Sequence, residues 1–317
     1  MVQYIIKRLL SSIMVILVII TASFFVMRIA PGGPFDTERK LPPEIEANLK
    51  AKYNMDKPLM EQYLLQMESI VLRADFGPSM KYPDRTVNEI LAEGLPTSMM
   101  LGAQALLIAL VVGLVAGLFA GFKQNQWQDY LTMTAAMVGV SVPSLVLGPL
   151  LIYLFAVEVN WFDPGGWRPF WEAQWSLLDH FKSTVLPSLT LGLVYAAYIA
   201  RLTRSGMLEV VRQDYVRTAR AKGLGERAVV TGHMLRGALL PVVSYLGPAF
   251  ARMLTGSVVV EKIFNIPGLG THFVESAFNR DYPLVLGTIV LYSTLLVLLN
   301  LVVDIFYTLL DPRVSYD

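Results

Sequence analysis

The residues that could carry out covalent or metal chemistry are few and widely separated. The three histidines, His180, His233 and His272, do not have the spacing of a metal site. The chain contains no cysteine, which excludes disulfides and thiolate ligands. It also lacks the GxxxxGK[ST] phosphate loop, the HExxH metal motif and the GxSxG nucleophile motif. We therefore expect a protein that is not an enzyme and binds no metal or cofactor of its own.

One basic segment is distinctive in an otherwise apolar chain. Residues 217–225 read RTARAKGLG. The surrounding residues 206–222 contain no proline and fit a single helix. Its apolar side chains recur at the i, i+3, i+7 spacing of one helical stripe, formed by Leu208, Val211 and Tyr215.

The polar face of this predicted helix has two interpretations. Arg217 and Arg220 lie away from the apolar stripe, and Gly223 stands where a helix C-cap adopts a positive φ. The arginines could meet lipid phosphates at the membrane interface. Alternatively, the helix docks a cytoplasmic partner, and the small side chains of Ala219 and Ala221 allow that partner to approach closely.

The composition indicates an all-α polytopic membrane protein. The 317 residues are 54% hydrophobic and only 16% charged, whereas soluble domains carry about 25% charged residues. The net charge of +1 gives no reason to expect a nucleic-acid partner. About 20 apolar residues cross a bilayer. Five uncharged runs, and a sixth interrupted by Arg252, predict six spans: 9–27, 94–122, 130–157, 183–200, 237–260 and 282–303.

The distribution of basic residues predicts the orientation. With the N-terminus inside, the short cytoplasmic segments hold twelve Lys and Arg residues, whereas the short outer loops hold four. Positive residues favour the cytoplasmic side, so both termini and RTARAKGLG are expected there.

This orientation divides the chain into three predicted parts. Residues 1–30 are the N-terminus and first span. Residues 31–93 form an outer segment of two short helices, with a break at Lys57-Pro58, and a loop. This segment either caps the outer face or docks an external partner. Residues 94–317 form the core with its cytoplasmic loop 201–236.

Three residues are candidates for a transport path. Arg252 interrupts a span, where a central arginine costs roughly 2.5–3.5 kcal/mol and normally faces a cavity or a partner. It could meet a carboxylate in such a cavity, or it could pack against Glu261 or snorkel. Asn300 lies in the last span, and Pro143 can bend the third. Structural hydrogen bonding is the default role for Asn300, whereas at Pro143 a static kink and a gating bend are equally open.

A glycine pattern points to close helix packing. Gly113, Gly117 and Gly121 recur at every fourth position in GLVAGLFAG. Such spacing lets two helices approach closely, and we expect it to serve packing within this chain before a subunit interface.

Several motifs together resemble a known family. RTARAKG followed by ALLP (238–241) resembles the coupling-loop motif of ABC importer permeases, in the form found in the peptide and nickel branch. VVVEKIFNIPGLG (258–270), AFNRDYPLVLG (277–287) and NLVVDIFYTLLDPRV (300–314) resemble further segments of that branch. The residues between 28 and 82 are most similar to oligopeptide permeases.

The resemblance implies a type I ABC importer permease in a bacterial cytoplasmic (inner) membrane. Such a chain pairs with a second homologous permease subunit as a heterodimer. Two ABC ATPase subunits use ATP and Mg²⁺, and an extracytoplasmic binding protein delivers the peptide. The implied coupling residues are Arg217, Thr218, Ala219, Arg220, Ala221, Lys222, Gly223, Leu224 and Gly225. The implied function is oligopeptide import by alternating access.

Other functions remain open on the sequence. Permeases of the same branch carry dipeptides, nickel, glutathione or opines. An ion-coupled secondary transporter would instead require paired carboxylates in mid-span, which the sequence does not show, since its acidic residues lie at span ends or outside them. A membrane scaffold or sensor would leave uptake unchanged when deleted.

Overall fold

The computed structural model describes residues 2–29, 42–82 and 84–310. Within these ranges every regular element is a helix, apart from an isolated β-bridge between Pro78 and Thr86. The all-α class is therefore confirmed. The PGGP stretch at 31–34 and the C-terminal residues 311–317 lie outside the described residues.

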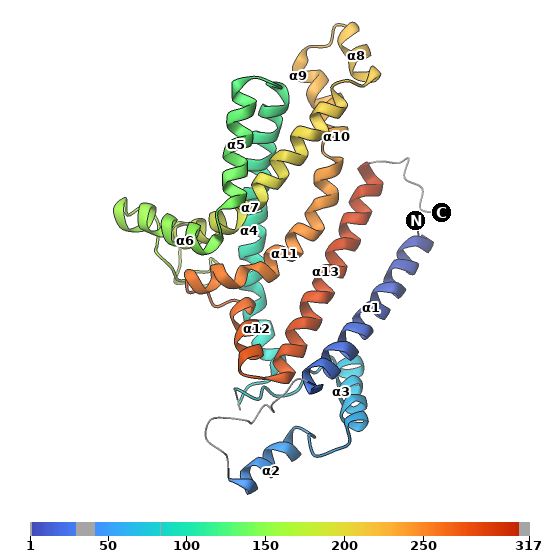
Figure 1. Ribbon diagram of the computed structural model, residues 1–317, viewed down its shortest axis with the longest axis vertical. Helices are drawn as coiled ribbons and strands as arrows, with labels where there is room; N and C mark the ends of the chain where they lie inside the picture. The colour runs from blue at the N-terminus through green and yellow to red at the C-terminus, as the bar shows by residue number, and fades with distance from the viewer. Residues whose placement is uncertain (1, 30–41, 83, 311–317) are drawn as a thin grey trace. The chain divides into compact units, whose positions relative to one another are not determined.

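Four helices are long and apolar enough to cross a membrane (Figure 1). They are α1 (Val2–Ile29), α4 (Val87–Phe122), α7 (Leu177–Val210) and α13 (Tyr282–Leu310). Two bent pairs raise the number to as many as six. One joins α5 (Trp127–Ser141) to α6 (Ser144–Leu151) and a π-helical segment, Ile152–Glu158; the other joins Glu226–Ala238 to α11 (Leu240–Ile263).

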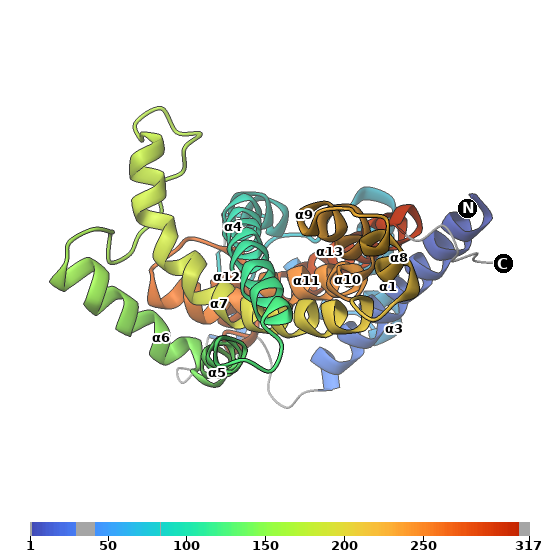
Figure 2. The same ribbon diagram turned by 90° about the horizontal axis from the view of Figure 1, so that it is seen from above.

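The predicted span 130–157 is not one straight helix. It turns by 104° where α5 ends and α6 begins (Figure 2). Val142 is extended there, with ψ 116°, and Pro143 precedes the first turn of α6. Proline disfavours helical backbone at the residue before it and donates no backbone N–H. The apolar run carries no information about this change of direction, whereas Pro143 lies at the bend, where a proline was expected to allow one.

The chain divides into two compact units. The first contains Met1–Pro96 and Gly268–Val297, and the second contains Thr97–Pro267 and Leu298–Asp317. These units are defined by contacts within the chain. The predicted boundaries at residues 30 and 93 instead separate membrane spans from an outer segment, and they stay a prediction.

The first unit confirms the two short helices expected within 31–93. They are α2 (Pro43–Lys52) and α3 (Leu59–Arg73), and the break between them falls at Pro58, as predicted. Their apolar side chains join α1 and α13 in a small core of Ile20, Ile70, Leu286 and Val290.

A buried carboxylate holds the loop that follows α3. Asp281 is fully buried between α12 (Leu269–Phe278) and α13, and it accepts hydrogen bonds from the hydroxyl of Ser79 and the backbone N–H groups of Met80 and Lys81. Tyr53 donates to the Ser79 carbonyl at 2.8 Å. Burial, and then the negative charge of Asp281, raises the pKa of Tyr53.

The second unit is built on a close contact between α4 and α7. A Cβ placed at Gly113 would lie 2.7 Å from the Ala196 carbonyl oxygen, and one at Gly117 would lie 2.5 Å from that of Ala200. At Gly121 it would lie 2.8 Å from Met207 Cβ. We call this contact the glycine seam. It confirms that the glycine repeat serves packing within the chain.

Candidate functional site

The basic segment forms a separate short helix. α7 ends at Val210, a turn follows, and α8 (Asp214–Ala221) begins after Gln213. The continuous helix predicted over 206–222 is therefore wrong. Gln213 has extended backbone with ψ 145°, which ends the run of helical dihedrals and turns the chain. Figure 1 shows α8 beyond the end of α10, beside α9.

The buried face of α8 also differs from the predicted stripe. Val216 and Ala219 are buried, with 0% and 3% exposure, whereas Tyr215 is 46% exposed. The break at 211–213 resets the helical phase, so the i, i+7 relation to Leu208 no longer holds. Ala219 therefore faces the interior of this chain and does not offer a partner the close approach that its size suggested.

A glycine cap ends α8 as the sequence predicts. Gly223 has φ +77°, a conformation that L side chains rarely adopt. Its N–H donates to the Arg220 carbonyl at 2.9 Å, and the N–H of Leu224 donates to the Ala219 carbonyl at 3.4 Å. These two bonds form the Schellman motif. The cap fixes the direction in which the chain leaves the helix.

The nine predicted coupling residues form one exposed rim, except for Ala219. The other eight, Arg217, Thr218, Arg220, Ala221, Lys222, Gly223, Leu224 and Gly225, are exposed. Thr218 donates its hydroxyl to the Asp214 carbonyl at 2.9 Å, within the first turn. The rim therefore presents cations, a backbone turn and one leucine on a rigid helix end.

Two ion pairs order the cations of this rim. Arg220 makes a bidentate contact with Glu226, with Nη2 at 2.6 Å from Oε1 and Nε at 3.2 Å from Oε2. This hydrogen bond raises the pKa of Arg220 and ties α8 to α9 (Glu226–Val229). Arg217 also lies 3.6 Å from Asp214, but both side chains are largely exposed. It contributes little to stability.

A compact apolar cluster joins α8 to the end of α7. Met207, Val210, Val216 and Ala219 pack with side chains of α9, of the π-helical segment Val230–Met234 and of α10 (Leu235–Ala238). A Cβ at Gly206 would lie 2.3 Å from the Ala238 carbonyl oxygen, so α7 and α10 are in backbone contact. We call the apolar side chains that α7, α8, α9, the π-helical segment and α10 pack together the α8 cluster. Its packing connects α8 directly to the end of α7.

Arg252 lies on an exposed face of α11. Its Nε donates to the Pro248 carbonyl at 3.3 Å, and its guanidinium lies 5.8 Å from the ring centre of Tyr245. Glu261 is fully buried on the same helix and accepts from the hydroxyls of Ser98 and Ser257. An exposed arginine on a predicted span cannot remain in lipid without large cost, so this face points to a partner or an aqueous path.

The other two path candidates lie on different elements. Asn300 of α13 is half-buried, and its Oδ1 lies 3.0 Å from where a Cβ of Gly247 on α11 would stand. Pro143 is exposed at the bend between α5 and α6. The structure thus places Asn300 against the helix that carries Arg252, whereas Pro143 marks the bend.

A buried ion pair was not found by sequence reasoning. Asp129 is 1% exposed and accepts from Nε and Nη2 of Arg204 at 2.6 and 2.7 Å. The pair joins the start of α5 to α7. The two residues lie 75 positions apart, and neither belongs to a recognisable motif. The only signal was that both charges border apolar runs.

Comparison with known proteins gives the family. Residues 113–316 match the family described as "Binding-protein-dependent transport system inner membrane component", and residues 1–101 match its N-terminal region. The chain belongs to this family. It is therefore a transport component with several membrane spans.

Curated relatives match along the whole chain. The "Oligopeptide transport system permease protein OppB" of Haemophilus influenzae is 44% identical over 316 residues, and that of Salmonella typhimurium is 46% identical. Each match covers 100% of both chains. The "Dipeptide transport system permease protein DppB" of Bacillus subtilis is 45% identical over 315 residues, 99% of this chain and 98% of that one.

A solved structure shows the same fold. The MetNI methionine ABC transporter in inward facing conformations matches with a TM-score of 0.53 at 17% identity. The match covers 70% of this chain and 96% of that chain. The fold is that of a type I ABC importer permease.

Proposed function

We propose that this chain is a permease subunit of an ATP-driven importer that carries oligopeptides across the bacterial cytoplasmic membrane by alternating access. The observation that carries the proposal is the 44–46% identity, over the full length, to oligopeptide permeases of two bacteria. The chain itself hydrolyses no ATP, because it has no phosphate loop.

The proposal requires three kinds of protein partner. A second, homologous permease subunit completes the pore as a heterodimer. Two ABC ATPase subunits bind ATP and Mg²⁺, and an extracytoplasmic binding protein delivers the peptide. The family description, which names binding-protein-dependent transport, supports the last of these.

The α8 rim is proposed as the contact with an ATPase subunit. The rim has eight exposed residues and contains the Gly223 cap, and the apolar face of α8 packs against α7. A displacement of α8 therefore reaches α7 through the α8 cluster and α4 through the glycine seam. Closure of the ATPases would bias the spans between inward and outward access, as a ligand biases a two-state element.

Path-lining roles are proposed for Arg252, Asn300 and Pro143. Arg252 supplies a cation suited to a peptide carboxylate, because arginine pairs with carboxylates through several N–H donors. Asn300 supports α11 beside Gly247. Pro143 permits the bend between α5 and α6 to change, since proline leaves a backbone carbonyl without its helical donor.

A matched pair of glycine variants tests the function and the coupling role together. The reconstituted complex with its binding protein is assayed for ATP hydrolysis and for uptake of a hexapeptide. Gly223 and Gly225 both have open space around a missing Cβ, but Gly223 has φ +77° whereas Gly225 has φ −62°. Gly223→Asp and Gly225→Asp therefore add the same side chain, and only the first strains the cap.

We expect Gly223→Asp to abolish peptide-stimulated ATP hydrolysis and uptake, and Gly225→Asp to retain most of both. Equal losses in an assembled complex would assign the effect to the added charge at the interface. Retention of both activities in Gly223→Asp would contradict coupling through this segment. A complex that falls apart would make the segment chiefly a docking surface.

Dipeptide import is a second candidate, favoured by the 45% identity to the Bacillus subtilis dipeptide permease. The same assay with a dipeptide in place of the hexapeptide separates the two. Stimulation by neither peptide, but by nickel or glutathione, would move the cargo to another member of the branch.

The orientation is also proposed, with both termini and α8 in the cytoplasm. The natural absence of cysteine allows single-cysteine labelling. Ala51→Cys on α2 and Gln126→Cys, just before α5 in the predicted cytoplasmic segment 123–129, introduce exposed thiols away from the α8 rim. An impermeant thiol reagent added to intact cells should label position 51 and leave position 126 unlabelled until the membrane is opened. The reverse pattern overturns the proposed orientation.

A further inference from the structure

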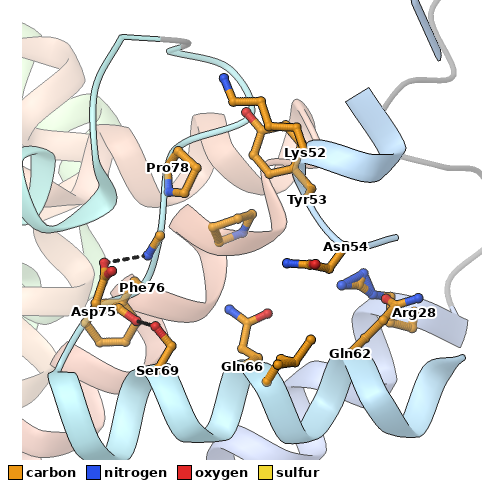
Figure 3. A pocket seen from close by; sticks show the side chains of 13 residues that line it. Arg28, Lys52, Tyr53, Asn54, Gln62, Gln66, Ser69, Asp75, Phe76 and Pro78 are labelled. Carbon is orange, nitrogen blue, oxygen red and sulfur yellow. Dashed lines mark hydrogen bonds between the residues drawn. The ribbon is translucent and has the colours of Figure 1, made fainter. Parts of the chain in front are cut away.

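The first unit contains a polar pocket that the proposed mechanism does not use. Figure 3 shows it between the end of α1, the chain around α2 and α3, and the loop that follows α3. Its volume is about 140 Å³. The polar side chains that line it include Arg28, Lys52, Asn54, Gln62, Gln66 and Ser69.

Arg28 is held in this pocket by aromatic rings, and two of its three guanidinium nitrogens have no hydrogen-bond partner among the described residues. Its guanidinium lies 4.9 Å from the ring centre of Phe24 and 5.3 Å from that of Tyr282. The Nε and Nη1 atoms are buried and have no hydrogen-bond partner among the described residues. The rings fix the guanidinium while leaving N–H groups to a ligand. Buried charged donors are normally paired with an acceptor.

Gln62 supplies an acceptor at the same end of the pocket (Figure 3). Its Nε2 donates to the Lys57 carbonyl at 2.7 Å, which fixes the orientation of the amide. The Oε1 atom is buried and, within the described part of the chain, has no partner. A fixed buried acceptor requires a donor from the group that fills the pocket.

We infer that this pocket binds the carboxyl-terminal end of a peptide. The terminal carboxylate lies against Arg28, and the N–H of the last residue donates to Gln62 Oε1. A simple inorganic anion offers acceptors alone and leaves Gln62 unsatisfied, whereas a peptide terminus offers an anion and a donor two bonds from it.

The size of the pocket sets how much of the peptide it holds. A single water occupies roughly 10–15 Å³ on this scale, so about 140 Å³ accommodates a carboxylate with its own residue and little more. Longer peptides would extend from the pocket. The site therefore binds the free carboxyl terminus that all unmodified peptides share, and its affinity does not depend on peptide length. This inference rests on the proposed function, because it takes the peptide to be the transported substrate.

The test compares two forms of one hexapeptide in the reconstituted complex with its binding protein. One form has a free carboxyl terminus, and the other has a carboxyl-terminal amide. Uptake of each is measured with the natural chain and with Arg28→Gln. The same binding protein is used throughout. Its own preference for acid or amide therefore cancels when the acid-to-amide uptake ratio of Arg28→Gln is divided by that of the natural chain. We expect Arg28→Gln to reduce the preference for the free acid about tenfold, as expected for loss of one charge-assisted hydrogen bond.

Two further variants keep the test decisive. Gln62→Glu leaves Arg28 unchanged and places a carboxylate beside the bound terminus, so it should depress uptake of the acid more than of the amide. Arg73→Gln is the control, because Arg73 forms an exposed pair with Glu68 on α3 and does not line the pocket. It should leave the preference unchanged.

Three results overturn the inference. Equal losses of acid and amide in both pocket variants would leave Arg28 and Gln62 with a structural role only. Unchanged uptake of both forms would mean that water alone occupies the pocket. If the pocket variants lose the ATP hydrolysis that the peptide-free binding protein stimulates, the pocket contacts the binding protein and not a peptide. If the natural chain takes up neither form, the proposed cargo has failed, which is a separate result.

Discussion

The glycine seam and the α5–α6 bend lie in the same unit and pack in opposite ways. At the seam, α4 and α7 approach so closely that three glycines have no room for a Cβ. At the bend, apolar side chains such as Met137 and Leu145 are exposed, at 69% and 65%. An apolar groove of about 510 Å³ is lined by residues of α4, α5, α6 and α7. Gly139 on α5 has only one neighbour within 4 Å of a missing Cβ, at 3.9 Å.

The difference separates a rigid connection from a deformable one. Closely packed helices transmit displacement, because their contacts allow only discrete rearrangements. Helices around an open groove can change their angle at little cost in contacts. We therefore expect the seam to carry motion from α8 to the spans and the bend to adapt to a subunit, a lipid or a substrate.

The largest effect should come from filling the seam. Gly117→Val places a branched side chain 2.5 Å from the Ala200 carbonyl oxygen and the Thr203 Cβ, where the backbone must shift. We expect destabilisation of about 3 kcal/mol, the upper part of the usual range for overpacking. Folded protein recovered from membranes should fall sharply. Gly139→Val on α5 is the matched control and should be recovered normally. Similar recovery of both variants would contradict the comparison.

An intermediate effect is expected at the ion pair that joins α5 to α7. Asp129→Asn removes the charge that accepts two hydrogen bonds from Arg204, whose side chain is 26% exposed. Partial solvation of Arg204 limits the loss to about 1.5–3 kcal/mol. The midpoint of thermal unfolding in detergent should fall. Arg217→Gln, which breaks an exposed pair, serves as the control with a change near zero. An unchanged midpoint in Asp129→Asn would show that the pair does not hold α5.

The smallest effect on stability should come from the bend itself. Pro143→Ala restores a backbone N–H at an exposed position and relieves the restriction on Val142. We expect a change in unfolding free energy below about 1 kcal/mol, together with altered peptide-stimulated ATP hydrolysis if the bend takes part in transport. A stability loss as large as that of Gly117→Val would make the bend a rigid element and overturn the distinction.

Several features followed from local sequence because local physics decides them. Apolar runs predicted the long helices, since a helix satisfies its backbone hydrogen bonds within one segment when it lies in lipid. Gly223 predicted a positive-φ cap, and Pro58 predicted the break before α3; both residues restrict or permit particular dihedrals by their own chemistry. The four-residue glycine repeat predicted a close helix contact, because that spacing places small residues on one face.

The tertiary structure alone decided which surfaces and which partners these elements have. The turn at 211–213 changed the phase of α8 and buried Ala219, which the unbroken repeat had left accessible. Asp129 meets Arg204 across 75 residues, and Arg28 and Gln62 meet in one pocket from different helices. Such contacts depend on how separate helices pack. The type of a side chain and its position along its own helix do not determine which residue it meets on another helix.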